Sequence, residues 1–453
     1  MTIVDHKWTA LPVPHAVTQP DRVPKERYFD REFYELEAKL LWPRVWQMAC
    51  RLEEIPGPSD FVEYEILDQS VVVVRNDEGG VQAFQNACRH RGVKLAEGRG
   101  TLNSGFTCPF HGWCYGTDGQ NTFVSQKRMF TEHNLEPSEL NLVPVRTEVW
   151  GGCVWINFDD DAPPLRTYLE PIAGILDAWK VDSLRTEWWY ACHVPANWKL
   201  VQEAFVEQYH VLETHPQLRI PGRFPPRKGQ PFDPKDFIDG ELQYLQMMCE
   251  GMAGMVHGDD VRIAEGMRDI ELPDDYQAAV ASWNRALNTA VTDWHRKAGH
   301  DVPDLNELDD QSFNEPMAYC FPHYIVLPMY SSASAYRFRP LGPEETLMEI
   351  WSLSRTPKDE NSRPTPPEVW AHNDHRWPPI PTQDFSNLER QQRGLHAKGF
   401  EYMRLSELGE GHISNYQRMI DGFLAGLPYE KLLPALSRIN VHPLEQPVLD
   451  VPL

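Results

Sequence analysis

The chain has 453 residues, 41% of them hydrophobic and 24% charged, which is the composition of a water-soluble globular protein with two or three domains. Its formal net charge of −23 argues against nucleic-acid binding and against docking on anionic membranes, because so acidic a surface repels phosphate groups. No apolar run approaches the roughly 18 residues of a membrane span, and residues 1–15 contain no apolar signal-peptide core, so we expect a cytoplasmic protein.

The order of hydrophobic patterns predicts an all-β segment followed by a mixed one. Residues 24–50 are predicted to be helical, and from about 60 to 157 short β-branched runs alternate with Gly and Asp turns. Later strand-like patterns cover 184–194 and 318–355, whereas 222–240 has the composition of a long loop. Helical patterns recur over 196–214, 274–298, 384–404 and 413–425. The second half is therefore predicted to be α+β, with helices against an antiparallel sheet.

Two Cys–His pairs stand in the β-rich segment. Cys88-Arg-His90 is followed, after seventeen intervening residues, by Cys108-Pro-Phe-His111, and each pair is bounded by glycine. Two thiolates and two imidazoles suit a tetrahedral zinc ion or a [2Fe–2S] cluster. Zinc sites usually group Cys with Cys and His with His, whereas here each loop offers one of each. This order favours the Rieske arrangement, in which two cysteines bind one iron and two histidines the other.

A second candidate metal site lies in the segment from Asn197 to Pro216. Glu207 and His210 are spaced to share one helix face, and Pro216 disfavours helix at His215, so that its ring can turn back toward the same point. Two histidines plus one carboxylate make the facial triad of non-haem ferrous enzymes. A His pair alone is a weak signal, since His295 and His300 have the same spacing and are interpreted as solvent-exposed.

Asp384 is the best candidate for the missing carboxylate. It precedes a run with helical apolar spacing (Phe385, Leu388 and Leu395). The competing interpretation is that Asp384 is only the N-cap of that helix. The residue types alone support a metal ligand and an N-cap equally well.

These motifs resemble the Rieske non-haem iron oxygenases, the family of ring-hydroxylating alpha subunits. The resemblance rests on Cys-x-His-Arg-Gly, on Cys-Pro-Phe-His-Gly-Trp-x-Tyr ending at Tyr115, on Asn-Trp-Lys…Glu…Tyr-His…His, and on the acid–Phe…Gln-x-Gly-Leu helix. Respiratory Rieske proteins carry an extra cysteine in each loop, where this chain has Val93 and Phe110. The bridging acid, more often Asp, is Glu207 here, as in the branch that includes the carnitine and choline oxygenases. The residue after Glu203, commonly Asn, is Ala204.

The resemblance implies a specific set of cofactors and site residues. Cys88, His90, Cys108 and His111 would hold the [2Fe–2S] cluster; His210, His215 and Asp384 would hold a mononuclear Fe(II); and Glu207 would bridge the two centres. The implied organisation is an N-terminal helical segment (1–45), an all-β Rieske domain (46–165) and a catalytic domain of helix-grip, START-like fold (166–453). The sheet at 318–355 and the loops at 222–265 would line the substrate cavity.

The implied activity is that of a terminal oxygenase, which uses O₂ and electrons that originate from NAD(P)H. A reductase, with or without a ferredoxin, would supply the electrons, and the assembly would be a homotrimer or an α3β3 complex. The expected reaction is mono- or dihydroxylation of an aromatic or other apolar compound, as in aromatic hydrocarbon catabolism. The alternatives are N- or O-demethylation, quaternary-ammonium monooxygenation, or Rieske electron transfer without oxygenase activity. A lipid-type binding module would leave the set His210, His215 and Asp384 unexplained. A zinc hydrolase would leave the two Cys–His pairs unexplained.

Overall fold

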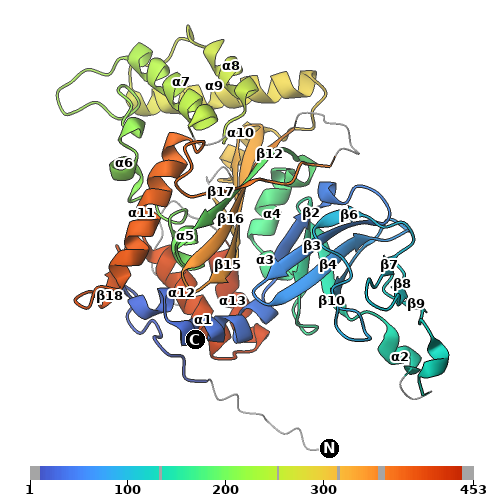
Figure 1. Ribbon diagram of the computed structural model, residues 1–453. Coiled ribbons are helices and arrows are strands. Elements are labelled where there is room, and N and C mark those ends of the chain that lie inside the picture. Colours follow the sequence, from blue (N-terminus) through green and yellow to red (C-terminus); the bar gives the residue numbers. More distant parts are fainter. Residues whose placement is uncertain (1–10, 132–134, 252–254, 314–316, 356–362, 441–453) are drawn as a thin grey trace, which may run out of the picture. The chain divides into compact units, whose positions relative to one another are not determined.

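The computed structural model describes residues 11–131, 135–251, 255–313, 317–355 and 363–440 (Figure 1). The chain forms two compact units. The β-rich unit comprises Trp42–Thr167 with Pro357–Thr365, and the α+β unit comprises Met1–Leu41, Tyr168–Thr356 and Pro366–Leu453. Residues 11–41 therefore belong to the same unit as most of the chain after Tyr168.

The β-rich unit is built on a seven-stranded sheet and a three-stranded sheet. The large sheet has the order β2-β11-β10-β5-β4-β3-β6, and the small one β7-β8-β9. Val71–Val74 of the interior strand β4 are all fully buried, which explains why this strand is a continuous valine run rather than an alternating pattern. The strands are β2 (Gln47–Arg51), β3 (Asp60–Ile66), β4 (Gln69–Arg75), β5 (Val81–Gln85), β6 (Arg99–Thr101), β7 (Phe106–Thr107), β8 (Cys114–Tyr115), β9 (Asn121–Phe123), β10 (Pro144–Trp150) and β11 (Cys153–Asn157), with helix α2 at Pro137–Leu140.

The α+β unit contains a six-stranded sheet of order β13-β14-β15-β16-β12-β17. Its pairs are antiparallel except for the edge pair β12–β17, which is parallel. The strands are β12 (Arg185–Val194), β13 (Ala318–Cys320), β14 (Tyr324–Met329), β15 (Ser332–Gly342), β16 (Glu345–Ser354) and β17 (Val369–Ala371); β1 (Arg22–Pro24) pairs separately with β18 (Tyr402–Arg404). The expected architecture, an all-β part followed by an α+β part with helices on a mainly antiparallel sheet, is confirmed.

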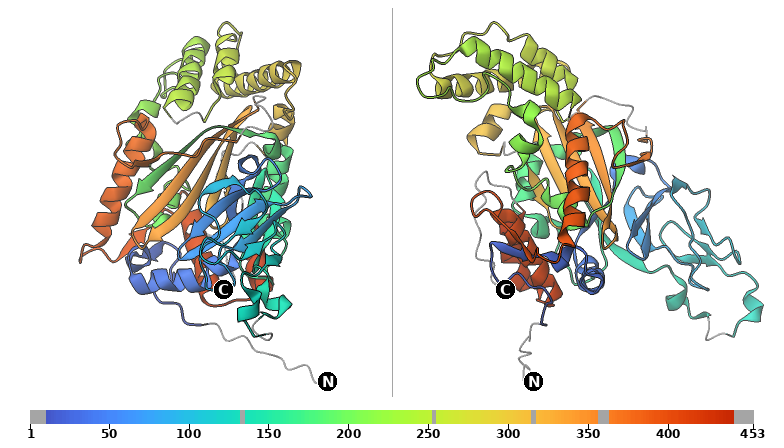
Figure 2. Two further views of the ribbon diagram at one scale, coloured as in Figure 1. Left: turned by 45° about the vertical axis from the view of Figure 1, so that its right-hand side comes forward. Right: turned by 60° about the vertical axis from the view of Figure 1, so that its left-hand side comes forward.

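Helices cover both faces of this sheet and one of its ends (Figures 1 and 2). Helix α11 and the short α5 lie over the face that carries Tyr336, because Phe205 after α5 packs on Tyr336 with ring centroids 4.6 Å apart. The helices are α1 (Arg31–Leu40), α3 (Leu165–Leu169), α4 (Ile172–Ala178), α5 (Trp198–Glu203), α6 (Val211–Thr214), α7 (Pro234–Glu250), α8 (Gly258–Glu265), α9 (Tyr276–Lys297), α10 (Leu305–Asp310), α11 (Pro379–Leu395), α12 (Gly411–Leu424) and α13 (Tyr429–Ile439). Among the described residues, no helix combines the length and apolarity needed to cross a bilayer.

Several local predictions were wrong. The helix expected over 24–50 is limited to α1, since Gln47–Arg51 forms strand β2 instead. The long loop expected over 222–240 ends at Pro234, where α7 begins with Asp233 as its N-cap. His295 is not solvent-exposed: it is 2% exposed and its Nε2 lies 3.0 Å from Oδ1 of Asp260. The prediction was misled by the charged residues Arg296 and Lys297, which follow His295 in the sequence. They lie on the exposed face of α9, whereas His295 lies on its buried face.

Candidate cluster site and candidate metal centre

The two Cys–His loops have the same local geometry. Cys88 and His90 follow strand β5, and Cys108 and His111 lie between β7 and β8. In each loop a glycine N–H donates to the carbonyl of the cysteine, from Gly92 over 2.8 Å and from Gly112 over 3.0 Å. Both glycines have positive φ (77° and 71°), so these tight turns require a residue without a side chain. The repeated turn places Cys and His of each loop on one side.

The four proposed cluster residues converge. Cys88 and Cys108 are 3% and 2% exposed, whereas His90 and His111 are half-buried. The Nδ1 atoms of the two imidazoles lie 3.1 Å apart, so both rings direct the same type of nitrogen to one point. This is the arrangement that an inner Cys pair and an outer His pair would need to hold two irons.

The chemistry of these donors fits a cluster. Burial, together with the adjacent Cys108, raises the pKa of the Cys88 thiol, against the lowering effect of the Tyr115 hydroxyl. Two buried thiols in contact resist ionisation unless a metal supplies positive charge. Burial and the neighbouring His111 lower the pKa of His90, which favours the neutral imidazole that binds metal. The residues present therefore fit a [2Fe–2S] cluster with Cys₂His₂ ligation.

Aromatic side chains support this site. The Tyr115 hydroxyl lies 3.3 Å from Sγ of Cys88 and also accepts the N–H of Arg89 over 3.0 Å. The Trp113 ring stacks on His90 with centroids 5.0 Å apart. All eight cysteines are free, so no disulfide joins the two loops in the described part of the chain.

The candidate mononuclear site is built where helix is interrupted. Helix α5 ends at Glu203, Glu207 and His210 lie in the turn that follows, and α6 ends at Thr214. The prediction that Glu207 and His210 share a helix face was therefore wrong, although the turn still brings them together. His215 has left the helix (φ −118°, ψ 69°), as the following Pro216 predicts.

Asp384 lies between the two histidine rings. Its Oδ1 is 3.0 Å from Nε2 of His215 and 3.7 Å from Nε2 of His210. One ligand atom from each of the three residues lies within 4.8 Å of the other two, the one such cluster of three or more potential ligands found among the described residues. Helix α11 begins at Pro379, five positions before Asp384, so the N-cap interpretation of Asp384 was wrong.

The outward nitrogens of both histidines are held by side chains. Nδ1 of His210 lies 2.6 Å from Oε1 of Glu207, whose other oxygen accepts the His210 backbone N–H over 2.9 Å. Nδ1 of His215 lies 2.8 Å from Oε1 of Gln383, which also accepts from Nε2 of Gln217 over 2.8 Å. Since an amide or carboxylate oxygen accepts, each Nδ1 carries the proton and each Nε2 has its lone pair free for a metal.

Gln383 and Gln217 were missed by the sequence analysis. Nothing in the local pattern singles out either glutamine, although Gln383 directly precedes the proposed ligand Asp384. Gln383 and Asp384 are adjacent on a helix, so their side chains point about 100° apart. Both can contact His215 only because its ring lies between these two directions.

The charges fit a divalent cation. Burial lowers the pKa of His210 and His215, but the hydrogen bonds and charges of Glu207 and Asp384 outweigh it and raise both pKa values. Two carboxylates beside two imidazoles place negative charge at this point, which is why the imidazoles hold protons more tightly. A cation such as Fe²⁺ would neutralise this charge, so two His and one Asp fit a facial-triad site.

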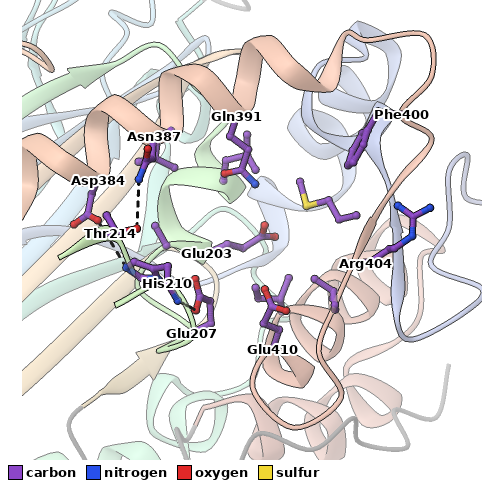
Figure 3. A pocket seen from close by; sticks show the side chains of 16 residues that line it. Glu203, Glu207, His210, Thr214, Asp384, Asn387, Gln391, Phe400, Arg404 and Glu410 are labelled. Atoms are coloured by element: carbon purple, nitrogen blue, oxygen red, sulfur yellow. Dashed lines mark hydrogen bonds and ion pairs between the residues drawn. The ribbon is translucent and has the colours of Figure 1, made fainter. Parts of the chain in front are cut away.

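A cavity of about 440 Å³ opens beside this cluster (Figure 3). Glu207, His210 and Asp384 line one part of it, and Asn387, from α11, is bonded to Thr214 over 3.4 Å. Glu203 and Glu410 also line this cavity. Burial raises the pKa of Glu203 to about 7, against hydrogen bonds from Gln417 and Tyr28. The wall next to Glu207 is thus acidic and protonatable.

A second, narrow cavity of about 20 Å³ touches Asp384 from the sheet side, and we call it the inner cavity. Sheet residues form one wall, as expected for the strands at 318–355. Phe321, in contrast, belongs to the core and stacks on Phe423. The inner cavity is lined by Phe205, Tyr336, Met348, Ile350, Pro381, Asp384 and Phe385.

Both units match known families. Residues 181–426 match the family described as ring hydroxylating alpha subunit (catalytic domain), and residues 45–131 match the Rieske [2Fe-2S] domain. The first match covers more than half of the chain. The chain belongs to the ring-hydroxylating alpha subunit family. The recognition made from the motifs is confirmed, and with it the two cofactor types that the family's domains carry, a Rieske [2Fe–2S] cluster and a mononuclear iron.

Several relatives are similar in sequence over part of the chain. The carnitine monooxygenase oxygenase subunit of Escherichia coli (strain K12) is 31% identical over 196 residues, which is 43% of this chain and 52% of that protein. The glycine betaine monooxygenase oxygenase subunit of Pseudomonas aeruginosa (strain UCBPP-PA14) is 29% identical over 43% of this chain and 45% of that protein. The 2-aminobenzenesulfonate 2,3-dioxygenase subunit alpha of Alcaligenes sp. is 33% identical over 40% and 47%. The matched region spans about half the length of these relatives.

Solved structures share the fold along the chain. The quaternary ammonium Rieske monooxygenase CntA in complex with L-carnitine superimposes with a TM-score of 0.60 and 18% identity, covering 92% of this chain and 99% of that one. A naphthalene 1,2-dioxygenase variant bound to phenanthrene has a TM-score of 0.63 and 19% identity, covering 93% and 97%. The fold of this ring-hydroxylating alpha subunit is therefore common to enzymes with unlike substrates.

Proposed function

We propose that this ring-hydroxylating alpha subunit is the terminal oxygenase component of a Rieske non-haem iron system. The observation that carries the proposal is the convergence of His210 Nε2, His215 Nε2 and Asp384 Oδ1, with both opposite nitrogens already bonded. Three ligands on one side leave open positions, and bound ferrous iron would there supply the activation of O₂. A structural zinc site would be closed by a fourth protein ligand.

Cys88, His90, Cys108 and His111 would hold the cluster that receives electrons from a reductase, with or without a ferredoxin. Because Nδ1 of each cluster histidine faces the other, Nε2 of each ring points away from the cluster and can donate to a partner. We propose that Glu207, in the wall of the 440 Å³ cavity, accepts such an N–H from a neighbouring chain in a ring-shaped trimer. One solved relative is described in terms of carnitine oxidation and inter-subunit electron transfer, which supports this proposal.

For the reaction we propose monooxygenation of a small organic compound that carries a cationic nitrogen. Relatives named for carnitine and glycine betaine support it, as does the bridging glutamate at Glu207. Hydroxylation of an aromatic ring is the second candidate, because the inner cavity beside Asp384 is apolar and aromatic on the sheet side and relatives named for 2-aminobenzenesulfonate and anthranilate match as well.

The first experiment is a count of iron and acid-labile sulfide per chain on anaerobically purified protein, with an EPR spectrum after reduction. About three irons and two sulfides with a Rieske-type signal are expected. Single-turnover product analysis with ¹⁸O₂ would then report whether one or two oxygen atoms enter the product. About two irons and two sulfides would leave an electron carrier and overturn the oxygenase proposal, and zinc alone would overturn the whole assignment.

A further inference from the structure

A third cavity, of about 310 Å³, lies on the same sheet face as the inner cavity, and we call it the outer cavity. Along strand β16, Met348 and Ile350 line the inner cavity and Ser352 lines the outer one; alternate residues of a strand share a face. At the start of α11, Pro381 lines the inner and Pro378 the outer cavity, one helical turn apart. The two cavities are thus neighbours along one sheet face, and the inner one reaches Asp384.

The inner cavity has room for about one water molecule, so it does not hold an organic substrate as it stands. The outer cavity has the size at which small-molecule sites begin, roughly 300 Å³. A compound that travels to the metal along this face would therefore first occupy the outer cavity.

One wall of the outer cavity is aromatic. Trp188 and Tyr190 project from β12 to the same face with ring centroids 4.8 Å apart, and Tyr190 lies 4.6 Å from Trp370 of β17. The rings of Trp188 and Tyr190 present negative quadrupole faces to this cavity, whereas one face of Trp370 is already covered by Arg376. Such a wall attracts organic cations, whose charge is spread over methyl groups and is weakly hydrated.

The wall of the outer cavity contains two acidic side chains beside the basic Arg376 and His257. Glu187 and Glu250 both line it. Glu250 accepts a hydrogen bond from Gln246 and has no cationic ion-pair partner among the described residues. Burial raises the pKa of the Cys249 thiol in the same wall, and the charges of Glu250 and Glu187 raise it further. An ionisable neighbour thus experiences a negative field in this cavity.

Two cationic groups are already engaged. Arg376 lies with its guanidinium carbon 4.2 Å from the centroid of the Trp370 ring, and it donates to Glu368 and Asp374 over 2.8 Å each. His257 Nε2 lies 3.3 Å from Glu187 and its Nδ1 lies 3.3 Å from Asp259. Because Arg376 is neutralised by two carboxylates, it offers little attraction to an anionic ligand.

We propose that the outer cavity is a capture subsite for an organic cation of the quaternary-ammonium or methylated-amine class, held by Trp188, Tyr190 and Glu250 before it reaches the inner cavity. This inference rests on the proposed function, since it names where that function's substrate class is selected. Recognition is by charge and π-face contact, so a neutral compound of the same shape binds more weakly.

The test is calorimetric titration of the metal-loaded chain without O₂ or reductant, using choline and its uncharged isostere 3,3-dimethylbutan-1-ol as probes. Choline is expected to bind at least about tenfold more tightly than the isostere. Trp188→Leu and Glu250→Gln are each expected to weaken choline binding by about three- to tenfold while leaving isostere binding unchanged. The matched controls are Trp294→Leu and Glu265→Gln, exposed residues of α9 and α8 that do not line the outer cavity.

Equal binding of choline and the isostere, or equal losses in the control variants, would overturn the capture subsite. Binding of anthranilate in place of choline, abolished by Arg376→Gln, would also overturn it, because the cavity would then select an anion. The outcome is independent of turnover. If the protein contains about three irons but does not bind choline, only the capture subsite is refuted. If it lacks the mononuclear iron but binds choline as expected, only the oxygenase proposal is refuted.

Discussion

His215 and Gln383 stand 168 positions apart in the chain, yet Nδ1 of the imidazole lies 2.8 Å from the amide oxygen of the glutamine. This bond fixes the tautomer and orientation of a proposed iron ligand. Gln383 also directly precedes Asp384 on α11, so one helix turn both supplies the carboxylate and aligns a histidine for the same metal.

We expect Gln383→Leu to weaken binding of the mononuclear iron by about ten- to hundredfold, because His215 loses the acceptor that orients it. Iron affinity measured by chelator competition would report this, with the cluster's EPR signal unchanged. Gln383→Glu, which keeps an acceptor, should restore most of the affinity. Gln391→Leu, two turns further along α11, is the control; an equal loss there would contradict a positioning role for Gln383.

Asp384→Ala should remove the mononuclear iron and leave the cluster. Iron is expected to fall from about three to about two per chain at constant sulfide, because two imidazoles alone bind Fe²⁺ poorly. Helix α11 should remain intact in circular dichroism, since it begins at Pro379 and does not depend on Asp384 as a cap. Glu389→Gln on the same helix is the control, and full iron retention in Asp384→Ala would refute its role as a ligand.

Glu207→Gln should keep both metal centres but lose coupled turnover. The amide can still bond to His210, but it lacks the charge that stabilises electron transfer through this residue. Iron and sulfide counts, together with the ratio of product formed to O₂ consumed, test this directly. Glu213→Gln, an exposed acid on α6, provides a comparison. Unchanged product formation in Glu207→Gln would eliminate the bridging role.

Tyr115→Phe should lower the reduction potential of the cluster. A hydroxyl that donates to Sγ of Cys88 stabilises the extra electron of the reduced state, and its removal favours the oxidised state. A redox titration followed by EPR measures the potential. Tyr64→Phe removes a buried hydroxyl of the same unit that bonds to Gln47 instead, so it should leave the potential unchanged. Equal potentials in wild type and Tyr115→Phe would refute the effect.

Glu203→Gln should make stability less dependent on pH. Burial raises the pKa of Glu203 in the folded protein to about 7 from an ordinary value of 4.5. Its folded pKa is raised, so its contribution is fully present below about pH 4.5 and is lost as pH rises toward 7, by up to about 3 kcal/mol. In urea unfolding from pH 5 to 8, the free energy of unfolding of the variant should rise relative to that of wild type as pH increases. Parallel curves would contradict the raised pKa.

The cluster motif could be read from the chain because its geometry is local. Cys88 and His90, like Cys108 and His111, lie two or three residues apart in turns closed by glycine, so spacing alone determines that each pair faces one way. His210 and His215 are similar, since Pro216 ends the helix wherever the segment lies in the fold. The family resemblance follows from these same short motifs.

The sequence by itself thus predicted the candidate ligand residues, the cofactor types and the order of a β-rich part before an α+β part. Only the tertiary structure decided which carboxylate joins the histidines, because α11 had to be placed against His215 before Asp384 could be told from a helix cap. It also decided that Gln383 aligns His215, that His295 is buried, and that three aromatic rings from β12 and β17 share one wall of the outer cavity. The physical reason is that these relations join segments far apart in the chain, whose contacts depend on packing and leave no local periodicity to read.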